Sequence, residues 1–269
     1  MKTFPVVIKW TGSKRSVAPQ LAQLLPPMNV YYEPFLGGGA MIPFVKSNMG
    51  YVSDIIPELI DLWNNIKNSP EMVAEEYRLR WLDLQQNGAD VFYQVREHFN
   101  ATKNCFDFLF LTRTCVNGMI RYNEKGEFNN SFHLSRPGIN PDTLKKVIFL
   151  WNKHVQNINF LNVDYRECLS TVKKGDFVFL DPPYGGTKSR YTKTEFNLQD
   201  FYNELDRLNR VGAKWMLTFD GSAGSRTYSY APPTEVFKQH FYINTGNSSF
   251  SRLIDKKKDE IMESVYLNF

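Results

Sequence analysis

The chain has 269 residues, of which 42% are hydrophobic and 22% are charged, and its formal net charge at pH 7 is +4. These values suit a folded protein with one sizeable core, and they exclude a disordered chain, a coiled coil and a polyelectrolyte tail. No apolar stretch approaches the ~18 residues that a membrane span needs. Three cysteines without metal-ligand spacing favour free thiols in a reducing compartment. We therefore expect a cytoplasmic protein with no membrane anchor and no metal site.

The first third of the chain alternates between strand and helix patterns. Residues 30–35 form a short strand-like run that ends in three consecutive glycines, and residues 40–46 are expected to open a helix there. A second short strand is expected at residues 51–54, and apolar spacing predicts a helix over residues 57–68. This order is typical of a parallel sheet with crossover helices.

Strand signals almost vanish between residues 69 and 150. Aromatic-rich helical stretches at residues 92–99 and 106–114 precede an Asn/Gly-rich loop at residues 117–140. Beyond this region, strands are expected at residues 157–164, 177–180 and 215–219, followed by a final hairpin of residues 236–244 and 263–269.

We interpret the pattern as an α/β domain with a mainly helical insertion. The α/β domain is predicted to comprise residues 1–68 and 151–269, and the insertion to comprise residues 69–150. From Lys103 to Lys153 there are eight Lys/Arg and four Asp/Glu, so this segment alone carries a net charge of +4. Its mixture of arginine and asparagine side chains is the kind that contacts base edges and phosphates, which favours DNA as a partner over a merely solvated face.

A glycine-rich turn is the first candidate ligand site. It runs from Glu33 through Phe35 to Gly37 and Gly39, and Asp54 follows the next strand 21 residues after Glu33. Glycines allow a close approach of the backbone to a ligand, and an acid at the second strand can accept bonds from both ribose hydroxyls of a nucleoside cofactor. The third glycine of a nicotinamide-type fingerprint is absent, so a nicotinamide-dependent dehydrogenase is disfavoured.

The segment Asp181-Pro182-Pro183-Tyr184 is the most specific motif. It follows a fully apolar run, which places Asp181 at the carboxyl end of a buried strand, where open α/β sheets bind ligands. Two prolines fix two φ angles and remove two donors, so the Asp181 carboxylate and the Pro182 carbonyl form a rigid pair of acceptors. A planar substrate with an exocyclic amino group fits this pair, with its ring stacked on Tyr184.

The chain begins with a further motif, Lys9-Trp10-Thr11-Gly12-Ser13-Lys14. From the residues alone, it predicts the start of an amphipathic helix, with Ser13 as its N-cap and Trp10 in the core. An alternative is that Trp10 and Lys14 flank a zwitterionic ligand.

Together these motifs resemble those of the Dam-type (α-group) DNA adenine N6-methyltransferases. The resemblance rests on the Lys9–Lys14 motif, the Glu33–Gly39 turn, Asp54, the Asn117–Asn129 segment and Asp181–Tyr184, in this order. It implies a Rossmann-like methyltransferase fold with a mostly parallel sheet, a C-terminal antiparallel hairpin and a helical DNA-recognition insertion. It also implies that the enzyme uses S-adenosyl-L-methionine as cofactor and releases S-adenosyl-L-homocysteine.

The resemblance also assigns roles to individual residues. The residues that it places at the cofactor are Trp10, Lys14, Glu33, Phe35, Gly37, Gly39, Asp54, Asp164, Tyr165 and Asp181. Catalysis is assigned to Asp181, Pro182 and Tyr184. From the family's DNA-reading loop and from residue type, we predict DNA contacts by Arg113, Asn117, Met119, Arg121, Asn129, Arg136, Lys188 and Arg190. The family commonly has an aromatic residue that wedges into the duplex where this chain has Val116, and residues 132–138 look more like restriction-system relatives.

The sequence therefore predicts an enzyme that methylates N6 of adenine within a short specific sequence of double-stranded DNA, with base flipping. N4 methylation of cytosine is the nearest alternative, although such enzymes more often have Ser at the position of Asp181. A catalytically silent DNA-binding module is an alternative of a different class. The sequence leaves open whether a cognate restriction endonuclease is a partner.

Overall fold

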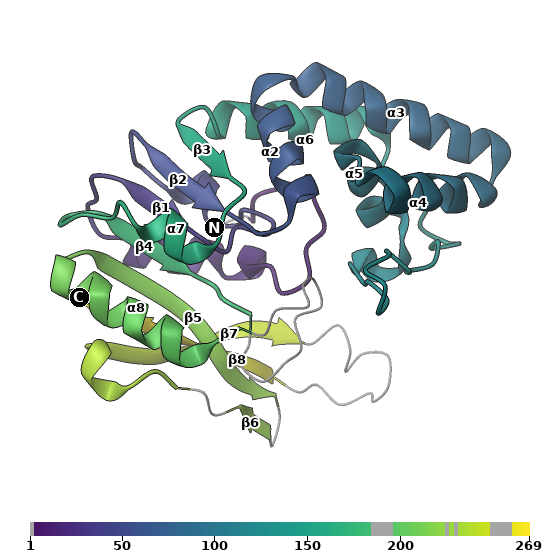
Figure 1. The fold of residues 1–269 in the computed structure, drawn as a ribbon. Helices are drawn as coiled ribbons and strands as arrows, with labels where there is room; N and C mark the ends of the chain where they lie inside the picture. Colours follow the sequence, from purple (N-terminus) through teal and green to yellow (C-terminus); the bar gives the residue numbers. More distant parts are fainter. Residues whose placement is uncertain (1–2, 184–195, 224–225, 229–230, 248–259) are drawn as a thin grey trace.

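The computed structural model describes residues 3–183, 196–223, 226–228, 231–247 and 260–269 (Figure 1). Its strands are β1 (Tyr31–Glu33), β2 (Gly50–Ser53), β3 (Ile158–Leu161), β4 (Phe177–Leu180), β5 (Lys214–Ala223), β6 (Arg226–Tyr228), β7 (Gln239–Asn247) and β8 (Glu260–Leu267). The sheet has the order β3-β2-β1-β4-β5-β8-β7, and β6 pairs with β5 outside this path. Strands β1 to β5 pair in parallel, whereas β8 is antiparallel to both β5 and β7. The mostly parallel sheet and its antiparallel end are confirmed.

The α-helices are α1 (Ala18–Leu21), α2 (Pro57–Asn68), α3 (Pro70–Asn87), α4 (Asp90–Thr102), α5 (Cys105–Thr114), α6 (Pro141–His154), α7 (Tyr165–Leu169) and α8 (Leu198–Val211). Short 3₁₀ turns are η1 (Lys14–Ser16), η2 (Ala22–Leu24), η3 (Ile42–Phe44), η4 (Val116–Gly118) and η5 (Thr234–Val236). Local signals explain several ends: α2 begins with Pro57, and α8 is capped by the Asn197 side chain and ends at Gly212 with φ +81°.

Alternating residues of the central strands fill two apolar layers, one on each face of the sheet. Phe177 and Phe179 of β4 belong to the larger core, which includes α1, α2 and α6. Val178 and Leu180 belong to the second core, under α7 and α8. Because a strand points successive side chains to opposite faces, four apolar residues in a row require a sheet that is covered on both sides.

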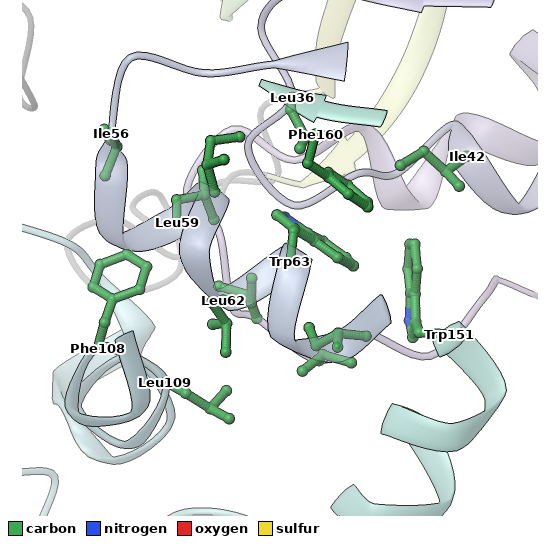
Figure 2. Packing of buried hydrophobic residues seen from close by; sticks show 14 of the residues in the cluster. Leu36, Ile42, Ile56, Leu59, Leu62, Trp63, Phe108, Leu109, Trp151 and Phe160 are labelled. Atoms are coloured by element: carbon green, nitrogen blue, oxygen red, sulfur yellow. The ribbon is translucent and has the colours of Figure 1, made fainter. Parts of the chain in front are cut away.

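Helix α2 joins the sheet to the helical insertion. Figure 2 shows Trp63 of α2 between Phe160 of β3 and Trp151 of α6. The Trp63 and Phe160 rings are stacked with centroids 5.6 Å apart, and the Trp63 and Trp151 centroids lie 4.9 Å apart. Phe108 and Leu109 of α5 belong to the same core cluster as these rings. The insertion and the sheet therefore share one continuous core.

The structure corrects one detail of the sequence interpretation. The helix expected at residues 40–46 is only the 3₁₀ turn η3, after which Val45 is extended. Helix α6 extends past residue 150, and its last turn carries Trp151 into the shared core. In the described part of the chain, none of the helices has the length and apolar character needed to cross a membrane.

Candidate active site

Three strands end in, or are followed by, an acidic residue at the carboxyl edge of the sheet. Glu33 ends β1, Asp54 follows β2, and Asp181 follows β4. The strand order reverses between β1 and β4, because the chain runs outward to β2 and β3 on one side and to β5 on the other. Ligands of open α/β sheets bind in the crevice at such a reversal.

Asp54 and Trp63 hold the glycine turn through hydrogen bonds to the backbone of Gly37. The Gly37 amide donates to Asp54 Oδ2 at 3.0 Å, and the Trp63 indole donates to the Gly37 carbonyl at 3.2 Å. Gly37 has φ +47°, and a Cβ at this position would lie 2.5 Å from Nε1 of Trp10. This close approach explains why the turn needs glycine, since a methyl group would collide with the indole.

Asp181 is held by two groups through one carboxylate oxygen. Lys14 Nζ lies 2.7 Å from Asp181 Oδ1, and the Thr218 hydroxyl of β5 donates to the same oxygen at 3.0 Å. Lys14 also lies 2.7 Å from Glu263 Oε1 of β8. The side chains of Lys14 and Glu263 are each 6% exposed, whereas that of Asp181 is 21% exposed. Asp181 is thus the member of this group that is most open to solvent.

Burial changes the protonation of two other carboxyls at this edge. Desolvation raises the pKa of Glu33 to about 8, although the Tyr31 hydroxyl, which donates to it at 2.8 Å, opposes the rise. Desolvation also raises the pKa of Asp54 to about 6, opposed by backbone donors that include Gly37 and Ile56. At neutral pH, Glu33 is therefore mostly protonated and Asp54 mostly ionised.

A cluster of aromatic side chains packs next to the glycine turn. Phe35 stacks on Tyr165 of α7 with centroids 5.4 Å apart, and Phe196 and Phe201 pack against this pair. Asp164 caps α7 by accepting from the Arg166 amide, and its side chain is 43% exposed. The sequence-predicted residues Phe35, Tyr165 and Asp164 thus lie on elements of the same sheet edge.

Four of the predicted DNA-contacting residues, Asn117, Met119, Arg121 and Asn129, lie on an irregular hairpin. We call residues 115–132 the recognition hairpin, because isolated antiparallel bridges join Cys115 to Phe132 and Tyr122 to Phe128. Asn117 has φ +58° and, like Arg121, is exposed. The Arg121 guanidinium donates to the Asn129 side chain at 2.9 Å. The segment expected to be an open loop is therefore paired at two places, Cys115 with Phe132 and Tyr122 with Phe128.

Buried polar groups hold the backbone of the recognition hairpin. The Asn130 side chain, 8% exposed, donates to the Val116 and Met119 carbonyls at 2.9 and 2.8 Å. Tyr122 donates to Glu58 of α2 at 2.9 Å, which ties the hairpin to the helix beside the sheet. Arg136 follows the hairpin and is exposed. The exposed residues Asn117 and Arg121 are thus presented by a fixed backbone.

Comparisons with known proteins agree on one family. A model of the D12 class N6 adenine-specific DNA methyltransferases matches residues 10–241. The chain belongs to this family. It is 31% identical to the type II methyltransferase M.MjaIII of Methanocaldococcus jannaschii, over 97% of this chain and 98% of that protein. It is 31% identical to the retron Ec67 DNA adenine methylase of Escherichia coli, over 73% and 70% of the two chains. For the DNA adenine methylase of Serratia marcescens the identity is 28%, over 75% and 74%.

The recognition of an adenine-specific DNA methyltransferase is thereby confirmed, but one residue assignment needs correction. Arg113 is 6% exposed, and its guanidinium donates to the backbone carbonyls of Val6 and Val7. It ties the N-terminal segment to α5 and is too deeply buried to contact DNA as predicted. Ser13 is the N-cap residue of η1, as predicted, but its side chain makes no capping hydrogen bond.

Other assignments stay predictions. Tyr184, Lys188 and Arg190 lie outside the described residues. Asn117, Met119, Arg121, Asn129 and Arg136 lie in or next to the recognition hairpin, and the predicted cofactor residues lie at the sheet edge, but no bound molecule tests these roles. No cluster of three or more potential metal ligands occurs among the residues that were placed.

Sequence reasoning missed Thr218 and Glu263, which complete the surroundings of Asp181 and Lys14. Thr218 is the one polar residue in the apolar run from Trp215 to Phe219, which is a usable signal for a functional side chain. Glu263 has no comparable local signal, since its partner Lys14 is 249 positions away. Glu263 lies on β8, which the fold pairs with β5, the strand that carries Thr218.

Proposed function

We propose that this enzyme methylates N6 of adenine within a short specific sequence of double-stranded DNA, with S-adenosyl-L-methionine as the methyl donor and with the target base flipped out of the helix. The observation that carries the proposal is the placement of Asp181 at the carboxyl end of β4, next to the glycine turn. The family assignment supports the adenine substrate. Donor, base flipping and sequence specificity are inferred from the geometry and the resemblance.

The residues of the sheet edge fit S-adenosyl-L-methionine. The buried Lys14 ammonium faces two carboxylates, Asp181 and Glu263, so the local charge balance favours a cationic ligand such as a sulfonium. The Ser13 hydroxyl is buried and has no hydrogen-bond partner among the described residues. It lies with Trp10 beside the glycine turn, so a polar ligand bound there could satisfy it. Asp54 retains lone pairs for ribose hydroxyls. The donor supplies an electrophilic methyl carbon and leaves as S-adenosyl-L-homocysteine.

Asp181 and Pro182 are proposed to bind the exocyclic amine. This amine is a poor nucleophile because its lone pair is delocalised into the purine ring. Acceptance of its two N–H bonds by Asp181 Oδ2 and the Pro182 carbonyl draws the nitrogen toward tetrahedral geometry and localises the lone pair. The nitrogen–methyl bond forms as the sulfur–methyl bond breaks, and the surplus proton then leaves the amine toward Asp181 or water. Alignment of the reacting atoms contributes about 7–11 kcal/mol in well-oriented systems.

Base flipping costs a few kcal/mol, because the adenine must leave its stack. Stacking on an aromatic ring returns about 1–3 kcal/mol per base, and Tyr184 is the residue that we propose for this contact. The recognition hairpin is proposed to read the sequence through Asn117 and Arg121, with residues 69–150 as the target-recognition insertion. Residues 132–138 resemble restriction-system relatives, so we propose a cognate restriction endonuclease as a cellular partner. The three described cysteines are free and buried, which fits the cytoplasm.

The test combines nucleoside analysis with variants of Asp181. Purified enzyme is incubated with duplex DNA and labelled S-adenosyl-L-methionine, and the DNA is digested to nucleosides. We expect the label in N6-methyladenine; label in N4-methylcytosine would contradict the proposal. Asp181→Ala should lose methyl transfer by about 10³-fold or more while DNA binding is largely kept. Asp206→Ala, which removes an exposed carboxylate, is the matched control.

The sequence specificity has a separate test. DNA from cells that express the enzyme is sequenced by a method that detects N6-methyladenine. We expect methylation at one short sequence, whereas methylation spread over unrelated sequences would contradict a specific target.

A further inference from the structure

Glu263 is a buried acidic residue that has no part in the proposed contacts with the substrate amine. It lies on β8, is 5% exposed, and its Oε1 is 2.7 Å from the ammonium of Lys14. Burial of a carboxylate is costly unless a charged partner compensates it. Lys14 is that partner, but Lys14 simultaneously contacts Asp181 at 2.7 Å. One buried ammonium is therefore shared by two carboxylates from different strands.

This sharing bears on how Asp181 is presented to a substrate. Lys14 and Thr218 both contact Oδ1 of Asp181, so the carboxylate is fixed through one oxygen. A substrate amine then has Oδ2 as its acceptor. Without the charge of Glu263, the attraction between Asp181 and the Lys14 ammonium is less opposed, although the Gly12 carbonyl still accepts from the ammonium at 3.3 Å. The ammonium would then move toward both oxygens of Asp181. It would then compete with the amine for Oδ2.

We propose that Glu263 is a positioning residue for methyl transfer: it holds the Lys14 ammonium to one side, so that Lys14 orients Asp181 through Oδ1 and leaves Oδ2 to the substrate amine. This role rests on the proposed function. Glu263 does not touch the substrate in this arrangement, and it acts through Lys14. The β5–β8 pairing, in which Gly221 stands opposite Glu263, supplies the geometry.

The first test is the rate of methyl transfer. Glu263→Gln keeps the shape of the side chain and removes its charge. We expect kcat to fall about tenfold or more, with the KM for DNA changed much less, because the loss concerns the presentation of Asp181 rather than DNA binding. Glu235→Gln removes an exposed carboxylate of η5 and serves as the control with wild-type kinetics. A Glu263→Gln variant that matches the control in kcat would overturn the proposal.

The second test uses thermal unfolding and requires neither donor nor DNA. Glu263→Gln should lower Tm in the wild-type background, because it removes one partner of a buried ammonium. In the Lys14→Met background the same change should raise Tm, because it removes a buried carboxylate that has lost its ammonium. A merely structural contribution of β8 would lower Tm in both backgrounds. A double variant that melts no higher than Lys14→Met, or that fails to fold where Lys14→Met folds, would overturn the coupling.

The two tests separate this inference from the proposed function. Wild-type enzyme that methylates no DNA would refute the proposed function and with it the role of Glu263 in transfer. Active wild-type enzyme combined with an unaffected Glu263→Gln variant would refute the inference alone. Reversal of the Tm effect together with a loss of kcat would support both.

Discussion

At the carboxyl edge of the sheet several ionisable groups are buried, with Lys14, Glu33 and Glu263 each at most 6% exposed. On the recognition hairpin, by contrast, the charged Arg121 is exposed and the buried polar group is the neutral Asn130. At the sheet edge, where we propose that the reaction takes place, a change of charge is expected to alter stability and methyl transfer together. On the hairpin, the exposed side chains can change while the buried ones preserve the backbone. The two regions therefore predict different couplings between stability and function.

The largest effect is expected from Gly37→Ala at the sheet edge. Its Cβ would lie 2.5 Å from the Trp10 indole in a left-handed conformation, so the turn or the indole must move. We expect a loss of about 3 kcal/mol or more in the free energy of unfolding and loss of S-adenosyl-L-methionine binding. Gly88→Ala is the matched control, since Gly88 has φ +79° but nothing within 4 Å of an added Cβ. Denaturant unfolding and calorimetry measure both quantities. Equal losses in the two variants would contradict the role of close packing.

The next effect concerns the support of the recognition hairpin. Asn130→Ala removes the donors to the Val116 and Met119 carbonyls, and we expect it to cost about 2–3 kcal/mol of stability because both carbonyls lose a buried partner. DNA affinity should fall while donor affinity is unchanged. Asn87→Ala on the exposed surface of α3 is the control. Loss of donor binding in Asn130→Ala would mean that the two regions are not separable in this way.

A smaller effect on stability is expected from the exposed Arg121. Arg121→Ala should change the free energy of unfolding by no more than about 0.5 kcal/mol. It should weaken binding to the target sequence by about 1–3 kcal/mol, as for loss of a bidentate base contact. Binding to target and unrelated duplexes at one salt concentration measures this discrimination. Equal weakening on both duplexes would assign Arg121 to the phosphate backbone instead.

The smallest change in side-chain shape is Glu33→Gln, and its effect on stability depends on pH. The pKa of Glu33 is raised to about 8 in the folded protein, so between about pH 4.5 and pH 8 the folded state binds a proton that the unfolded state lacks. Wild-type stability therefore contains a contribution that falls as pH rises through this window. Glutamine lacks this penalty, so the Tm of the variant relative to wild type should rise from pH 6 to pH 9. A Tm difference that is independent of pH would contradict an unusually basic Glu33.

Local patterns predicted much of the fold. The bounds of β4 (Phe177–Leu180) and of α2 (Pro57–Asn68) follow from an unbroken apolar run and from a proline-started helical period, and the structure reproduces both. The pairing of Tyr122 with Phe128 was missed, because the Asn/Gly-rich composition around it is equally typical of an open loop. The prediction of a helix at residues 40–46 was wrong, since the structure has only the 3₁₀ turn η3 there.

The candidate site was predictable to the extent that its residues carry motifs. Asp181 was placed at a strand end because an apolar run precedes it and prolines follow. Arg113 was assigned to DNA by residue type, although it closely follows the apolar run Phe108–Leu111, which is typical of a buried helix. In the structure every residue from Asp107 to Thr114 is buried. Glu263 required the three-dimensional pairing of β5 and β8, which no local pattern encodes.

The ring stack of Trp63, Trp151 and Phe160 in Figure 2 has a consequence for how such enzymes acquire new targets. Because Phe108 and Leu109 of α5 belong to the same core cluster as these rings, an exchange of residues 69–150 between relatives would also change the packing of the sheet domain. Substitutions at the solvent-facing positions of residues 115–132 leave that packing intact. Divergence in target preference is therefore expected to proceed through point changes on this surface rather than through domain shuffling.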